Sequence, residues 1–247
     1  TSQKMPFGFL GDFTDDRWVL ACTPEGGKLL HTPHYTALTN LTKRKGDFII
    51  NAGGELSGDM TTAFSGTEFD ERYLVIDEPY TEQLKAIRET YNINNLDVQK
   101  LSFAQNKSTR PVTTEMIRLK ARDFAANNSG KLYFMVNLAN RLESVPNEVR
   151  NRSTDVYINR GYVDEDSISY ILPDGYHLDK LLLNENIEKP FGKFTVSMKL
   201  NGKQLLYERR LQVNDGTYSK DDYQALVDFY QSVADADSYT AILVKNN

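Results

Sequence analysis

Apolar and polar residues alternate along the stretch from Lys193 to Leu200, which is the most regular pattern in the chain. Such alternation is typical of a strand with one buried face and one face in water. The next two residues, Asn201-Gly202, form a preferred hairpin turn. A second strand is predicted from Lys203 to Val213, and its spacing places four residues on one face: Leu205, Tyr207, Arg209 and Leu211. The two stretches together predict a β-hairpin.

Two stretches have apolar residues at helical spacing instead. Tyr80 to Tyr91 is predicted to be a helix, and Pro79 suits the first position of such a helix. Ser219 is a favourable N-cap residue for a second helix, which is expected to end near Ala234 or Asp235. Its predicted buried face contains Tyr223, Leu226, Val227, Tyr230, Val233 and Ala234.

Most of the remaining chain resembles short strands separated by turn residues. Thr113 to Ala126 is open to either a helix or a strand, and its alternation favours a strand that turns at Asn127-Asn-Ser-Gly130. Trp18 to Cys22 is predicted to be a short buried strand, and Leu29 to Tyr35 an extended linker. Further strands are expected at 42–51, 55–65, 96–103, 132–136, 155–159, 167–172, 176–183 and 239–244. The pattern predicts a mainly β (α+β) fold of antiparallel, sandwich-like sheets with two helices packed on them.

Composition narrows the classes of partner. The 247 residues carry a net charge of −5 with both signs well mixed, so a nucleic-acid partner is not expected. No apolar run approaches the roughly 18 residues that span a bilayer. The sequence opens Thr1-Ser-Gln-Lys-Met5 without an initiator methionine or a signal peptide. We therefore expect a fragment of a longer protein.

Cys22 and the histidines are the first candidates for chemistry. Cys22 with His31 or His34 could form a nucleophile–base pair, but a cysteine within an apolar strand is more often a small core residue. His31 and His34 could supply two zinc ligands, although a zinc site needs three or four. His177, isolated in the sequence, is expected to be an ordinary strand residue. We therefore expect no catalytic residue, no metal and no cofactor.

The acidic turn from Asp12 to Arg17 is the other candidate site. Asp12, Asp15 and Asp16 could bind calcium or contribute a carboxylate pair, with Arg17 beside them. The turn lacks the full pattern of a calcium loop, so a solvated turn in which Arg17 pairs with an aspartate is favoured. A role for these four residues in binding is kept as the alternative.

Several motifs resemble the C-terminal part of bacterial transglutaminase-like proteins, in which flanking β domains follow a papain-like core. They occur in the order of that family: 6–8 (Pro-Phe-Gly), 11–17, 23–27, 170–173, 190–192 and 216–218 with the capped helix. Thr1-Ser2 resembles the pair that follows the catalytic aspartate at the end of the core. The resemblance implies that the Cys-His-Asp triad lies upstream of this chain.

The resemblance also implies an organisation and a role. Residues 1–34 would be the tail of the core, 35–141 a β-rich middle region with one helix, and 142–247 a C-terminal β domain of unknown function. The expected role is a non-catalytic module of a secreted or periplasmic protein of the transglutaminase or cysteine protease type. It would scaffold the upstream core or position a protein substrate. The alternatives are an independent glycan- or protein-binding β module and a small hydrolase.

Overall fold

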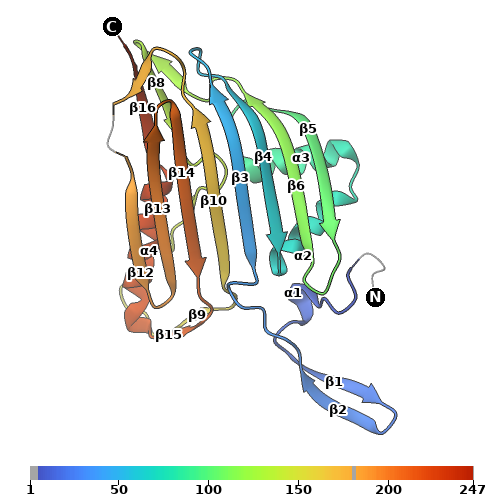
Figure 1. Ribbon diagram of the computed structural model, residues 1–247. Coiled ribbons are helices and arrows are strands. Elements are labelled where there is room, and N and C mark those ends of the chain that lie inside the picture. The colour runs from blue at the N-terminus through green and yellow to red at the C-terminus, as the bar shows by residue number, and fades with distance from the viewer. Residues whose placement is uncertain (1–4, 180–181, 247) are drawn as a thin grey trace.

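The computed structural model describes residues 5–179 and 182–246 and contains one large β-sheet at its centre (Figure 1). The eight strands are ordered β12-β13-β14-β10-β3-β4-β6-β5. Each neighbouring pair is antiparallel except β3 and β10, which run parallel at the middle of the sheet. The strands are β3 (Leu41–Ile50), β4 (Leu56–Ser65), β5 (Leu96–Asn106), β6 (Val112–Ala121), β10 (Tyr162–Ile171), β12 (Asn184–Lys189), β13 (Gly192–Asn201) and β14 (Gln204–Val213).

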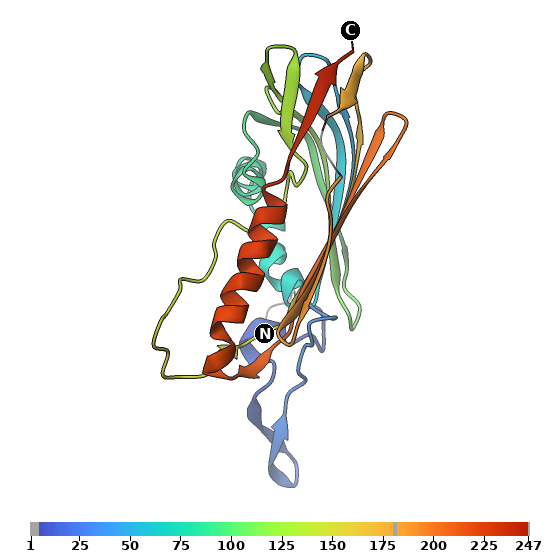
Figure 2. The same cartoon turned by 90° about the vertical axis from the view of Figure 1, so that its left-hand side faces the viewer.

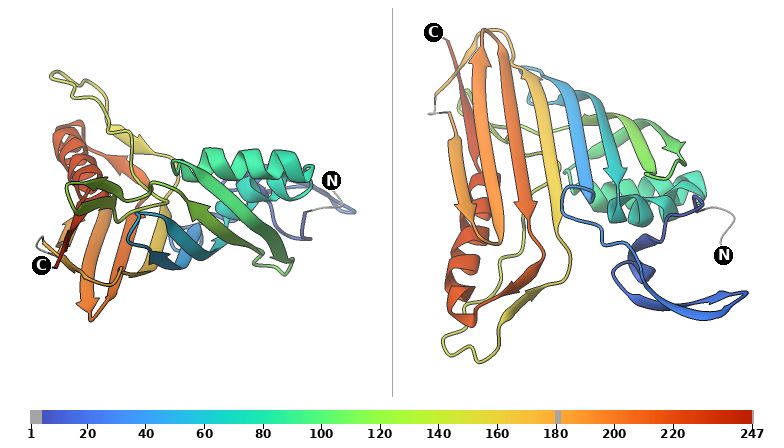
Figure 3. Two further views of the ribbon diagram at one scale, coloured as in Figure 1. Left: turned by 90° about the horizontal axis from the view of Figure 1, so that it is seen from above. Right: turned by 60° about the horizontal axis from the view of Figure 1, so that its bottom comes forward.

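The helices and a smaller sheet cover one face of this large sheet, as Figures 2 and 3 show. The smaller sheet has the order β11-β16-β8-β7. Phe134 of β8 meets Tyr170 of β10 with 5.5 Å between the ring centres, so the two sheets pack together. The elements of this layer are α2 (Thr67–Ile76), α3 (Tyr80–Tyr91), α4 (Tyr223–Asp237), β7 (Ala126–Asn128), β8 (Lys131–Met135), β11 (Tyr176–Leu178) and β16 (Thr240–Lys245).

The remaining elements are short. A two-stranded sheet pairs β9 (Val156–Ile158) with β15 (Gly216–Tyr218), and η1 (Lys220–Asp222) leads into α4. At the N-terminal end, α1 (Gly11–Thr14) precedes a hairpin of β1 (Trp18–Thr23) and β2 (Gly26–His31). This hairpin projects from the bottom of the molecule in Figure 1.

The mainly β fold with helices packed on antiparallel sheets is confirmed. The predicted helix over 80–91 coincides with α3, and the side chain of Ser219 accepts a hydrogen bond from the Asp221 N–H at the start of η1. The turn after Asn201 joins β13 to β14, and Gly202 adopts a φ of +57° there. Alternation and turn residues therefore predicted these elements because both signals are local.

Other boundaries differ from the prediction. β6 ends at Ala121, Asn127 and Asn128 belong to the short strand β7, and Ser129-Gly130 forms the turn from β7 into β8 in the smaller sheet. The linker expected from Leu29 includes the end of β2. Helix α2 was not predicted. The strand expected over 176–183 ends at Leu178 as β11, and Asp179, Leu182 and Leu183 are not in a strand. Residues 180–181 and the Thr1-Ser2 pair lie outside the described part of the chain.

The hydrophobic core is one cluster that contains residues from both the segment before residue 141 and the segment after it. Phe48, Met60 and Ile117 from the earlier strands belong to the same cluster as Phe194 and Leu205 from the later ones. The parallel pairing of β3 with β10 joins the two segments into one sheet. The division at residue 141 therefore does not separate two cores.

Candidate functional site

The hairpin of β1 and β2 carries large apolar side chains that face solvent. Trp18 is 67% exposed, Leu20 69% and Leu29 64%. Leu20 is paired with Leu29, and Trp18 with His31, so all four side chains share one face. A two-stranded hairpin alone is only marginally stable in water, and an exposed apolar patch is typical of an interaction surface. Trp18 to Cys22 is a strand as predicted, but the expectation that it is buried is wrong.

A groove of about 520 Å³ lies at the base of this hairpin. Phe9 is buried beside it, with ring-centre distances of 5.7 Å to Tyr35 and 5.4 Å to Phe69. Leu38 on its rim is 66% exposed. The groove is lined by Gly8, Phe9, Pro33, His34, Tyr35, Leu38, Thr39, Ser65, Gly66 and 109–112. We call the hairpin and this groove together the N-terminal surface.

The four residues of the acidic turn do not converge on one point. Asp15 is buried and forms an ion pair with Arg160, which also donates to the Asp12 carbonyl oxygen. Asp12 is exposed, and its N–H donates to a carboxylate oxygen of Asp70. The Arg17 guanidinium lies 5.4 Å from the centre of the Phe13 ring rather than on an aspartate. The turn therefore anchors the N-terminal segment to the rest of the molecule through Asp15.

His34 connects the acidic turn to Asp215, which lies between β14 and β15. Its Nδ1 lies 3.4 Å from a carboxylate oxygen of Asp16, and its Nε2 lies 3.1 Å from one of Asp215. The His31 Nε2 is 3.5 Å from the other Asp16 oxygen. Over residues 5–179 and 182–246, no three His, Cys, Asp or Glu side chains are arranged to hold a metal ion. The cluster thus ties the base of the hairpin to the body by hydrogen bonds or ion pairs.

Cys22 is exposed, so the expectation of a small core residue is wrong. It is paired with Gly27, whereas His31 is paired with Trp18 four residues further along. At about 3.3 Å per residue, the two side chains are separated by roughly 13 Å. The hairpin therefore does not bring Cys22 within hydrogen-bond reach of His31. His177 is a strand residue, as predicted, and its Nδ1 lies 2.7 Å from the Asn246 Oδ1.

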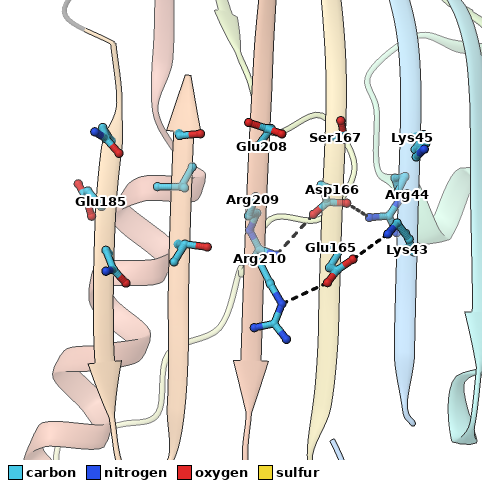
Figure 4. A pocket seen from close by; sticks show the side chains of 15 residues that line it. Lys43, Arg44, Lys45, Glu165, Asp166, Ser167, Glu185, Glu208, Arg209 and Arg210 are labelled. Carbon is cyan, nitrogen blue, oxygen red and sulfur yellow. Dashed lines mark hydrogen bonds and ion pairs between the residues drawn. The ribbon is translucent and has the colours of Figure 1, made fainter. Parts of the chain in front are cut away.

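The uncovered face of the large sheet carries a polar hollow of about 530 Å³ over five strands (Figure 4). At its centre Glu165 lies 3.2 Å from Lys43 and 3.2 Å from Arg210. Burial alone would raise the pKa of Glu165, but the contacts with Lys43 and Arg210 outweigh it and lower the pKa. The residues that line the hollow include hydroxyl and carboxamide side chains but no aromatic ring.

The next residue along β10 belongs to a set of buried charges on the covered face. Asp166 pairs with Arg44 on β3 and lies 3.5 Å from Arg209 on β14 (Figure 4). Arg209 also binds both carboxylate oxygens of Asp237 on α4, at 2.7 and 2.8 Å. We call Arg44, Asp166, Arg209 and Asp237 the charged strip. Two cations alternate with two anions, so these buried charges compensate one another.

A second group of buried charges continues the strip toward β6. The Arg44 guanidinium lies 5.6 Å from the Tyr91 ring centre, and the Tyr91 hydroxyl donates to Glu115. Glu115 also pairs with Arg72 of α2. Burial and the neighbouring Glu115 carboxylate raise the pKa of Tyr91 to about 12. Tyr91 therefore stays a neutral donor at physiological pH.

The sequence pattern contains only one clear signal of this strip. Arg209 falls on the predicted buried face between Tyr207 and Leu211, and a charged residue in that position needs a buried partner. Arg44, Asp166 and Asp237 carry no comparable signal. They are brought together by the parallel pairing of β3 with β10 and by the packing of α4, both of which are long-range contacts.

Part of the chain is similar to a known family model. Residues 130–243 match the model of DUF3858, a domain of unknown function with a solved structure. Among solved structures, a chain from Parabacteroides distasonis described as a "putative protease" is 17% identical, with a TM-score of 0.37. That alignment covers 49% of this chain and 24% of the other. No curated protein matches. In the described part of the chain, no helix has the length and apolar character needed to cross a membrane.

Proposed function

We propose that this chain is a non-catalytic module of a transglutaminase-like or cysteine protease-like protein and that its N-terminal surface docks on the papain-like domain. The exposure of Trp18, Leu20 and Leu29 on one hairpin face is the observation that carries the proposal. Burial of such side chains stabilises an interface by about 25 cal/mol per Å² of apolar surface. The sequence resemblance supports the choice of the papain-like domain as partner, and an extracytoplasmic location is part of the proposal for the same reason.

The position of the hairpin supports docking rather than disorder. Its base is fixed by Asp15–Arg160 and by the contacts of His34 with Asp16 and Asp215. The apolar face is therefore held at a defined place relative to the groove beneath it. A surface that is ordered before binding loses less conformational freedom when the partner arrives.

A glycan-binding module is the second candidate, and the polar hollow on the open sheet face is the observation in its favour. Hydroxyl and carboxamide groups such as Thr195, Ser197 and Asn186 could hydrogen-bond a saccharide. The lining lacks the aromatic rings that usually supply stacking area for a ligand. Docking through the N-terminal surface is therefore preferred.

Binding to the separately expressed transglutaminase-like domain of the same gene tests the proposal. We expect a saturable complex in sedimentation velocity or calorimetry, and we expect Leu20→Ser combined with Leu29→Ser to weaken it at least tenfold. Ile49→Ser is the matched control, because Ile49 is likewise an exposed apolar residue, at 56%, but lies on the open sheet face. Equal weakening by the control, or no complex at all, contradicts the proposal. Self-association of the chain alone that depends on Leu20 would assign the surface to a second copy instead.

A further inference from the structure

A polar cavity of about 270 Å³ lies on the covered face of the large sheet, between β10, β14, α2 and the segment that follows β8. The cavity is lined by Glu68, Asn140, Arg141, Leu142, Tyr162, Asp164, Arg209 and Leu211. It is separate from the N-terminal surface and from the hollow on the open face.

Asp164 is the distinctive group in this cavity. The charged strip beside it is balanced, because Asp166 and Asp237 already engage Arg44 and Arg209. Among the described residues, no basic group lies within ion-pairing distance of the Asp164 carboxylate. Its pKa is raised chiefly by burial, and the charge of Arg209 opposes that shift. The Asn140 side chain also opposes the shift, and its Nδ2 donates to the neighbouring Asp166 at 3.2 Å.

The other basic group in the lining points its donors elsewhere. The Arg141 Nη1 donates to the Asn137 carbonyl at 3.3 Å and its Nη2 to the Asn92 carbonyl at 3.4 Å. Leu142 and Leu211 add an apolar wall beside the acid. Two carboxylates, those of Glu68 and Asp164, therefore line the cavity, and the Asp164 carboxylate lies next to aliphatic surface with no described basic group at ion-pair distance. These two features match the two parts of an alkylammonium ion, a cationic head and an aliphatic stem.

We propose that this cavity binds a primary alkylammonium group, with its head on Asp164 and its stem against Leu142 and Leu211. A divalent metal ion is a poorer fit, because such ions take several oxygen ligands and no three suitable groups converge among the described residues. An anion would meet the Asp164 carboxylate. The chemistry is shared by a free amine and by a lysine side chain of a protein.

Titration with n-pentylamine, monitored by calorimetry and by amide chemical shifts of 140–142 and 162–164, tests the site. A charge-assisted hydrogen bond contributes about 1.5–3 kcal/mol, so n-pentanol should bind at least tenfold more weakly than the amine. Asp164→Asn should weaken amine binding by the same factor. Asp179→Asn, at an exposed aspartate that is paired with Lys131, should leave it unchanged. Nα-acetyl-lysinamide and glycinamide then separate a side-chain amine from an α-amine.

Each outcome decides the question. Saturable binding of pentylamine that Asp164→Asn weakens, in a variant whose circular dichroism spectrum and melting transition show a folded protein, supports the site. Pentanoate binding more tightly than pentylamine would assign the cavity to an anion and overturn the proposal. No saturable shift in the wild-type protein, or equal affinity in Asp164→Asn, would also overturn it.

Discussion

The hairpins β1–β2 and β13–β14 have the same connectivity but opposite environments. In β13–β14, Phe194, Val196, Leu205 and Tyr207 are at most 2% exposed, because α4 and the smaller sheet cover that face (Figure 2). In β1–β2, Trp18, Leu20 and Leu29 are more than 60% exposed, because no other element of the described chain lies over them. Apolar content alone therefore does not determine burial. A strand is buried only where the fold provides a second layer, and in β1–β2 we propose that a partner provides it.

Disrupting the ion pairs of the charged strip should lower the unfolding free energy more than any other change considered. Asp166→Ala removes the partner of Arg44 and one partner of Arg209, which leaves buried cations without compensation. Loss of one member of a buried pair typically costs about 3–5 kcal/mol of unfolding free energy. Urea denaturation measures this cost.

Glu165→Ala is the matched control in the adjacent residue of the same strand. Glu165 points to the open face and is partly exposed, so its pairs with Lys43 and Arg210 should contribute about 1 kcal/mol or less. Equal losses for Asp166→Ala and Glu165→Ala would show that the two faces of β10 do not differ as described.

The two hairpins can be compared directly with one substitution in each. Leu205→Ala empties a fully buried site in β14 and should lower the unfolding free energy by about 2–5 kcal/mol. Leu20→Ala truncates an exposed side chain in β1 and should change it by about 0.5 kcal/mol or less. Chemical denaturation of both variants measures the difference. A loss above 2 kcal/mol for Leu20→Ala would mean that the hairpin is already packed in the isolated chain.

The sequence predicted the parts of the fold that depend on local signals. Alternation and turn residues located β3, β4, β13 and β14, and helical spacing located α3. The parallel pairing of β3 with β10 was not predictable, because it joins segments about 120 residues apart with no local signal for that register. The burial of Trp18 to Cys22 was wrongly predicted because an apolar strand has the same pattern whether the core or a partner covers it. Asp164 was missed because its environment depends on the same long-range pairing.

Asp164 should have a smaller effect, which is a change of protein stability with pH. Burial raises its pKa in the folded protein, so the folded state holds the proton more tightly than the unfolded chain does. Its contribution to stability is therefore greatest at low pH and is lost as the pH rises from about 3.9, the ordinary value, through the raised pKa. Asp164→Asn should gain stability relative to the wild type across that window. Thermal melts from pH 3 to 7 measure the difference in melting temperature between Asp164→Asn and the wild type. A stability advantage of the variant that shrinks with rising pH would contradict this assignment.

Hydrogen exchange of the two hairpins is the most direct test of the docking proposal. In the isolated chain, the amides of 18–23 and 26–31 should exchange much faster than those of 192–201 and 204–213, because few buried contacts hold the first hairpin. Addition of the separately expressed transglutaminase-like domain should slow exchange in β1–β2 at least tenfold and leave β13–β14 unchanged. If β1–β2 is already as protected as β13–β14, or if the added domain does not change its exchange, the hairpin is not a docking element.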